Sequence, residues 1–163
     1  MLFGLIRLPD PQIDELLKDS SPLEQLIYPG DLPDDMESID LDKSWNGLLY
    51  LLTGKGLDEL DHPMTAIFFS GQLVDPEQDL GYGPAHYVRM PHVQDLSQQL
   101  QQLTLADVGQ RFDGKKMEAL NIYPGKWDDG QDSLDYLLEY FEELKNFYAR
   151  AALAEQAIIS FVY

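Results

Sequence analysis

Cysteine is absent from this 163-residue chain, and histidine is scarce, with three residues. The lack of cysteine excludes disulfides, thiolate nucleophiles and cysteine-based zinc sites. The histidines show no H-x-x-x-H or H-E-x-x-H spacing, and no G-x-S-x-G, P-loop or G-x-G-x-x-G motif occurs. The sequence therefore predicts no cofactor, no metal site and no catalytic residues of a recognisable kind, which makes an enzyme the less favoured class.

Long hydrophobic runs are also missing, since no stretch approaches the 18 apolar residues that a membrane-spanning helix needs. The apolar start of the chain is only about as long as a strand. It has neither a basic region nor a small-residue cleavage site, so we expect no signal peptide. These absences predict a cytoplasmic protein that does not bind membranes.

Basic side chains are few, with 11 lysines and arginines against 29 acidic residues, and the net charge is −18. Residues 1–82 hold 17 acidic and 4 basic side chains, a balance of −13, whereas residues 83–163 have a balance of −5. Such a surface repels nucleic acid and attracts a basic protein. The alternative is that the acidity only keeps the protein soluble.

The stretch from Asp40 to Gly54 is the strongest structural signal. Its apolar residues fall at helical spacing on one face, so neighbouring elements must bury them; they are Leu41, Trp45, Leu48, Leu49 and Leu52. We expect Asp40 or Asp42 to cap the start of this helix and Gly54 to end it in a left-handed conformation.

The remaining patterns predict a single domain of α/β mixed (α+β) class that covers residues 1–163. Further helices are expected at 12–18, 22–28, 91–103, 104–112, 115–120 and 133–154, and strands at 3–8, 85–90 and 157–163. Thr104 and Ser133 are the expected N-caps, with Asp107 completing a capping box. Residues 65–69 are ambiguous, and 71–84 is expected to be a surface loop. We predict a small mixed sheet that includes both terminal strands as neighbours, covered by helices.

Candidate binding residues come from two kinds of segment. The acidic loop that contains Asp31, Asp34 and Asp35 lacks the frame of a calcium loop, so its carboxylates are either solvated or recognise a basic partner. Among the aromatic residues, Trp127 in a Gly/Asp-rich turn is the best contact candidate. Tyr50 lies off the leucine stripe and is expected to line a groove.

The turn from Gly81 to Pro84 and the strand that follows it provide two further candidates. Tyr82 in this turn either lies over a pocket or packs as part of a rigid turn. His86, at an alternating strand position, is more typical of a buried, hydrogen-bonded histidine than of a metal ligand.

Five stretches in order resemble the YfbM-like family of small bacterial domains of unknown function. They are DLDKSWNGLLYLLTG (40–54), DLGYGPAHYV (79–88), RFDGKKM (111–117), IYPGKW (122–127) and YLLEYFEELKNFYARAA (136–152). The resemblance implies a compact cytoplasmic α/β domain without an established reaction. The family pattern W-H-G-L-H-Y-L-L-T-G carries histidines where this chain has Asn46 and Leu49, which weakens the enzyme hypothesis further. Asn46 can keep a hydrogen bond at its position, which Leu49 cannot, and is counted among the candidate binding residues. The positions that the resemblance marks as a shared surface are Asp42, Lys43, Trp45, Tyr50, Gly81, Tyr82, Gly83, Pro84 and Tyr87.

Two functional hypotheses follow from the sequence. The first is a non-enzymatic binding domain whose acidic N-terminal half docks on a basic protein, as an immunity protein inhibits a cationic toxin. The second is a small-molecule-binding or hydrolytic domain with a pocket between the 40–54 helix and the Gly81–Tyr87 turn. Its expected polar groups are Asp42, Tyr50, Tyr82 and His86. A third alternative is that these motifs only hold the fold.

Overall fold

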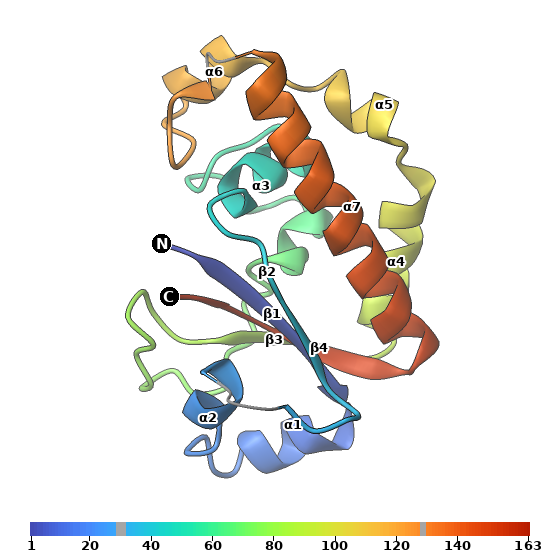
Figure 1. The fold of residues 1–163 in the computed structure, drawn as a ribbon. Helices are drawn as coiled ribbons and strands as arrows, with labels where there is room; N and C mark the ends of the chain where they lie inside the picture. The colour runs from blue at the N-terminus through green and yellow to red at the C-terminus, as the bar shows by residue number, and fades with distance from the viewer. Residues whose placement is uncertain (29–31, 128–129) are drawn as a thin grey trace.

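The computed structural model describes residues 1–28, 32–127 and 130–163. These residues contain a four-stranded sheet in the order β2-β1-β4-β3, in which every pair is antiparallel (Figure 1). The strands are β1 (Phe3–Pro9), β2 (Glu37–Asp40), β3 (His86–Val88) and β4 (Gln156–Val162). The predicted α+β domain with its two terminal strands side by side is confirmed, although the sheet contains no parallel pair. β2 was not predicted, because three of its four residues are polar and none is fully buried.

One face of the sheet is covered by two short helices, α1 (Pro11–Leu16) and α2 (Leu23–Ile27), which lie below the sheet in Figure 1. The predicted helices in this region are therefore confirmed, in shorter form. The small core on this side is made of side chains from the two central strands and the two helices, among them Ile6, Leu8, Ile13, Leu23 and Ile159.

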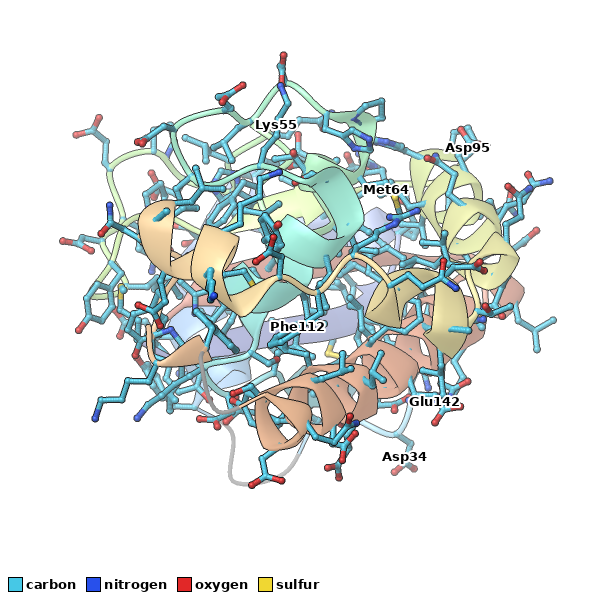
Figure 2. All side chains as sticks on the ribbon, turned by 90° about the horizontal axis from the view of Figure 1, so that it is seen from above. Asp34, Lys55, Met64, Asp95, Phe112 and Glu142 are labelled. Carbon is cyan, nitrogen blue, oxygen red and sulfur yellow. The ribbon has the colours of Figure 1, made fainter. Side chains whose placement is uncertain are left out.

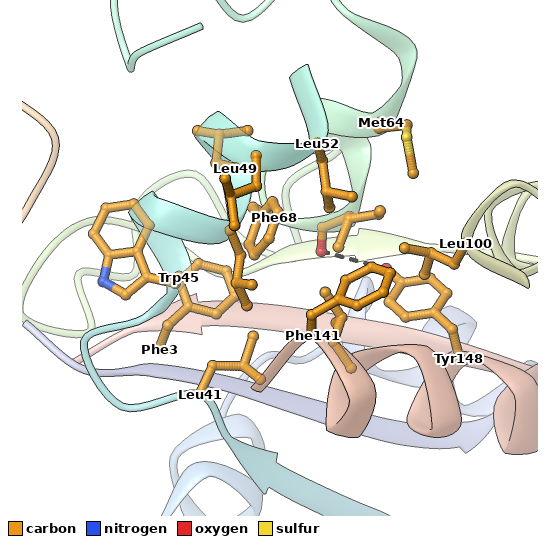
Figure 3. Close-up of a cluster of buried hydrophobic side chains, with 14 of the residues drawn as sticks. Phe3, Leu41, Trp45, Leu49, Leu52, Met64, Phe68, Leu100, Phe141 and Tyr148 are labelled. Carbon is orange, nitrogen blue, oxygen red and sulfur yellow. Dashed lines mark hydrogen bonds between the residues drawn. The ribbon is translucent and has the colours of Figure 1, made fainter. Parts of the chain in front are cut away.

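The larger core lies on the opposite face, under α3 (Trp45–Thr53), α4 (His92–Gln102) and α7 (Gln131–Leu153). Figure 3 shows Phe3 and Leu41 from the sheet side against Trp45 and Leu49 of α3, with Phe141 of α7 beside them. Two short helices, α5 (Leu105–Gly109) and α6 (Gly114–Ala119), connect α4 to α7. The ambiguous segment is a 3-10 helix, η1 (Pro63–Ile67).

The predicted central helix forms, but its start differs from the expectation. α3 begins at Trp45 after Ser44, because Asp40 still belongs to β2 and Asp42 has a positive φ of 49°, so neither aspartate caps it. Gly54 ends the helix in the left-handed conformation, with φ of 75°, as predicted. Inside α3, a Cβ atom on Gly47 would lie 2.7 Å from Leu137. This glycine lets α3 approach α7 closely.

Two further cap predictions have opposite outcomes. Thr104 caps α5, and Asp107 completes the capping box as predicted. Ser133 does not cap α7, because the helix already begins at Gln131. Pro29 and Gly30, which follow the predicted helix at 22–28, and the acidic pair Asp128-Asp129 lie outside the described residues. None of the helices in the described ranges is long and apolar enough to cross a bilayer.

Candidate functional site at the open edge of β2

The two edge strands of the sheet, β3 and β2, differ in whether another segment of the chain covers them. At β3, the preceding loop covers the edge: Tyr87 N–H donates to the Gln72 carbonyl at 2.9 Å, and Val74 N–H donates to the Ala85 carbonyl at 2.9 Å. No described segment pairs with β2 on the side away from β1. Because an exposed strand edge is a template for pairing with another chain, β2 is the edge at which a partner can add.

The register of β2 shows which of its backbone groups are free. Leu41 N–H donates to the Phe3 carbonyl at 2.8 Å, and Leu41 lies opposite Phe3 in the continuation of the β1–β2 register. Hydrogen-bonded pairs alternate along an antiparallel ladder, so Ile39 also bonds to β1. The N–H and C=O groups of Ser38 and Asp40 therefore point outward from the sheet.

Acidic and tyrosine side chains surround this edge. On α7, they recur at i, i+3, i+4 and i+7, which places them on one helix face; they are Tyr136, Glu139, Tyr140 and Glu143. This face is turned toward the end of β2, because Tyr136 Oη donates to Asp42 Oδ2 at 2.8 Å. Beyond the other end of this row, Arg150 Nε donates to Glu37 Oε2 at 3.0 Å. We call Glu37, Asp40, Asp42, Glu139 and Glu143 the acidic edge.

Only one carboxylate of the acidic edge is neutralised within the described chain. Glu37 pairs with both Arg150 and Arg7, and these contacts lower its pKa. The other four carboxylates have no lysine or arginine nitrogen within 4.0 Å among residues 1–28, 32–127 and 130–163. Their negative charge is thus left for an external cation.

The pKa values of groups at the acidic edge show that its carboxylates lie close to one another. Partial desolvation raises the pKa of Glu143, and the charges of Asp40, Glu139 and Glu37 raise it further, against the opposing effect of Arg150. Desolvation likewise raises the pKa of Tyr140, with Asp42 and Asp40 acting in the same direction. The carboxylates therefore repel one another in the folded protein.

A hollow of about 370 Å³ continues the acidic edge beside the first turns of α7. Its lining brings together three of the predicted site residues, Asp42, Lys43 and Trp127. The other lining residues are Pro124, Gly125, Lys126, Asp132, Ser133 and Tyr136. This juxtaposition of carboxylates, two lysines and a tyrosine suits contact with a polar protein surface.

Three residues predicted to contact a ligand have internal roles instead. Trp127 is 3% exposed, and its Nε1–H donates to the Ile122 carbonyl at 2.8 Å, so it holds its turn rather than projecting from it. Tyr50 is also 3% exposed. Asn46 is buried, and its Oδ1 accepts the Tyr123 N–H at 2.7 Å. The helical period could not reveal this burial, because η1, α5 and α7 from later parts of the chain pack against α3.

The Gly81–Pro84 turn borders a different hollow, of about 340 Å³, at the place where the sequence predicted a pocket. Tyr82 is 59% exposed and lines it, together with Met1, Trp45, Leu57, Leu60, Phe69 and Val162. Three of the expected polar groups, Asp42, Tyr50 and His86, are not part of its lining. The hollow is therefore lined mainly by apolar side chains, and none of its lining residues carries a carboxylate or an imidazole side chain.

The remaining predicted residues are dispersed. His86 Nδ1 accepts the Gly71 N–H at 3.2 Å, and burial lowers the pKa of the imidazole, as expected of a buried histidine. Tyr87 is half-buried against the small core. Asp34 and Asp35 are exposed in the turn before β2, and Asp31 lies outside the described residues. No group of three or more histidine or acidic residues in the described ranges is placed to hold a metal ion.

Sequence reasoning missed the α7 face and the open strand opposite it. The spacing of Tyr136, Glu139, Tyr140 and Glu143 was visible in the sequence, but it resembles any solvated helix face. This face becomes a candidate binding surface only because the structure places β2 beside it.

Comparisons with known proteins identify relatives without an assigned activity. The model of the family described as "Domain of unknown function (DUF1877)" matches residues 1–161. Among solved structures, the chain is similar to the protein of unknown function YfbM from Escherichia coli, at 17% sequence identity and a TM-score of 0.77, over 98% of each chain. At this identity, the similarity shows the fold alone. A search of curated proteins found no match.

Proposed function

We propose that this chain, which belongs to the DUF1877 family of domains of unknown function, binds a basic protein segment along the open edge of β2 and is not an enzyme. The observation that carries the proposal is the outward-facing backbone of Ser38 and Asp40, beside four carboxylates (Asp40, Asp42, Glu139 and Glu143) that have no lysine or arginine partner among the described residues. An extended segment would add as a fifth strand, with main-chain hydrogen bonds providing affinity and its side chains providing specificity.

The tyrosines of α7 give the proposed partner its anchors. Tyr136 and Tyr140 are partly buried, and their ring centroids lie 5.0 Å apart in an edge-to-face arrangement. An arginine or lysine of the partner would contact a tyrosine ring while pairing with Glu139 or Glu143. Cation–π contacts and aromatic anchors of this kind supply much of the energy of protein interfaces.

The same charges argue against a second copy of this chain as the partner. Edge-to-edge pairing of two β2 strands would bring two acidic edges together, and juxtaposed like charges cost several kcal/mol. A partner of opposite charge would instead be steered toward the edge by the net charge of −18. Inhibition of a cationic toxin by an immunity-type protein is one function of this form.

The proposal is tested with two synthetic peptides, each about eight residues long to match a typical strand. One alternates arginine with threonine, and the other alternates glutamate with threonine. We expect the arginine peptide alone to bind in titration calorimetry, and to shift amide resonances of residues 37–42 and 136–143 in NMR spectra. Equal binding of both peptides, or shifts confined to other residues, would refute the proposal.

Matched variants separate the edge from the overall charge. The triple substitution Asp42→Asn, Glu139→Gln and Glu143→Gln removes three charges from the acidic edge. The control Asp58→Asn, Glu77→Gln and Asp95→Asn removes three charges from other exposed positions. We expect the first variant to weaken the arginine peptide at least about tenfold and the control to weaken it much less. Equal losses in the two variants would assign binding to net charge alone.

The apolar hollow at Tyr82 supports a second candidate function, the binding of a small molecule. Four of its lining residues are exposed large hydrophobics, Met1, Leu57, Leu60 and Tyr82, and such a patch is typical of interaction sites. Substitution Tyr82→Ala would then abolish uptake of an apolar fluorescent dye such as anilinonaphthalene sulfonate. An unchanged dye signal would reject this candidate and leave the β2 proposal unaffected.

A further inference from the structure

A hollow of about 480 Å³ lies at the C-terminal end of α3 and is separate from the acidic edge. Its lining residues are Leu52, Thr53, Gly54, His62, Met64, Gln99, Gln102, Leu103 and Arg111. Although the chain has 29 acidic residues, none belongs to this lining. A cavity without carboxylates in so acidic a protein is suited to a ligand that other surfaces of the molecule would repel.

Arg111 differs from the other arginines of the chain. Arg7, Arg89 and Arg150 each form ion pairs with carboxylates. Within the ranges that the structure describes, Arg111 has no carboxylate oxygen within 4.0 Å, and its Nη1 instead donates to the Leu51 carbonyl at 3.1 Å and the Leu52 carbonyl at 3.4 Å. These bonds orient the guanidinium at the end of α3 and leave Nε and Nη2 available.

A second donor beside Arg111 is fixed by local geometry. His62 Nδ1 accepts the Met64 N–H at 3.1 Å, so the neutral imidazole carries its proton on Nε2. Gln99 and Gln102 add side-chain amides from α4, where they look like part of a solvated helix face in the sequence. The apolar side of the cavity is formed by Leu52, Met64 and Leu103.

We propose that this cavity binds a small organic carboxylate with an apolar body. The carboxylate would accept hydrogen bonds from the free nitrogens of Arg111, which presents the fork geometry that matches a carboxylate. The amides of Gln99 and Gln102 would hydrogen-bond to other polar atoms of the ligand. Its apolar body would contact Leu52, Met64 and Leu103. Donor side chains and an apolar floor in one cavity of this size are the usual composition of a small-molecule site.

The net charge of −18 opposes the binding of an anion. Salt weakens this long-range repulsion more than it weakens a direct contact with Arg111. At physiological ionic strength, charges separated by more than about 8 Å are largely screened. A guanidinium in direct contact with a carboxylate is screened much less. Asp107, four residues before Arg111, has its pKa lowered mainly by hydrogen bonds with Thr104, and it is near enough for the charge of Arg111 to lower that pKa further. Within the described residues no carboxylate oxygen lies within 4.0 Å of the guanidinium, so Arg111 is open to direct contact with a ligand carboxylate.

The test uses hexanoate as the probe and hexanamide as its neutral isostere, both titrated to about 20 mM to detect affinities in the millimolar range expected of so small a ligand. We expect hexanoate to shift the NMR amide resonances of residues 52–54, 62–64, 99–103 and 111, and hexanamide to bind at least about tenfold more weakly. Equal binding of the two compounds, or no shifts in these segments, would overturn the proposal.

Two variants keep the proposal falsifiable if one is impaired in folding. Arg111→Gln removes the proposed cation, with Lys115→Gln as a control of equal charge change outside the cavity lining. Because Arg111 also bonds to α3, Gln102→Trp provides an independent test: it fills the cavity from an exposed helix position. We expect both Arg111→Gln and Gln102→Trp to weaken hexanoate at least about tenfold. Retention of wild-type affinity by a folded Gln102→Trp variant would refute the site.

Discussion

Glu143 is partly desolvated on α7 and is close to three other carboxylates, so its pKa is raised in the folded protein. Because the folded state then binds a proton more tightly than the unfolded state, this residue makes the protein less stable as the pH rises through its folded pKa. The full destabilisation is present at neutral pH. A functional surface commonly has such a cost in stability.

We expect Glu143→Gln to increase the free energy of unfolding at pH 7 by a few tenths of a kcal/mol, as is usual for exposed charges. The gain should shrink as the pH falls below the ordinary glutamate pKa of 4.5, because Glu143 then becomes protonated in both states. Urea denaturation at several pH values measures it. The control is Glu142→Gln, on the same helix and visible at the surface in Figure 2. An equal gain from both substitutions would show that the position of Glu143 has no special effect.

Asn46 has a role that its place in the sequence does not reveal. Its Oδ1 accepts a hydrogen bond from the Tyr123 N–H; Asn46 is buried, and Tyr123 is half-buried. We expect Asn46→Ala to lower the free energy of unfolding by about 1–3 kcal/mol, because it leaves a backbone donor unsatisfied. Urea denaturation checks this value. A loss below about 0.5 kcal/mol, typical of a surface substitution, would contradict it.

At the scale of elements, the C-terminal end of α3 depends on the conformation of one residue. Gly54 has φ of 75°, and a Cβ atom there would meet nothing within 4 Å, so backbone strain is the only cost of a side chain. We expect Gly54→Ala to destabilise the protein by about 1 kcal/mol. Gly56 has no positive φ and is the matched control, since Gly56→Ala makes only ordinary contacts. Chemical denaturation of the two variants would contradict this explanation if their losses were equal.

The helices were predictable because their signals are local. The leucine stripe of α3, the Thr104–Asp107 capping box and the apolar face of α7 are each formed by residues within one short stretch of sequence. β2 could not be predicted in this way. Its four residues become a strand only through pairing with β1, about 30 residues away, and three of the four are polar, as is typical of a loop.

At the scale of the whole molecule, the net charge of −18 means that the acidic groups repel one another in the folded protein. Salt screens this repulsion. We expect the thermal midpoint of unfolding to rise between about 20 mM and 300 mM sodium chloride. The variant Asp58→Asn, Glu77→Gln and Asp95→Asn should show a smaller rise, because it carries three fewer negative charges. Calorimetry at several salt concentrations provides the measurement. A midpoint that is independent of salt in the wild type would show that the charges are too far apart to interact.

The candidate site was predictable only in part for a related reason. The sequence gives the excess of carboxylates and their concentration before residue 83, but not their meeting point. Asp40 and Asp42 meet Glu139 and Glu143 only because the chain returns through α7. Arg111 and His62 likewise come together across about 50 residues, without any motif that links them.

The two central strands come from opposite ends of the described chain. Leu2 N–H donates to the Tyr163 carbonyl at 2.7 Å, and Tyr163 N–H donates to the Leu2 carbonyl at 3.0 Å. A circular permutant that joins residue 163 to residue 1 by a short linker, and is reopened in the exposed turn near Glu77, would keep every strand pair. Trimming one strand's length from either terminus would instead remove half of the pair on which both hydrophobic cores rest.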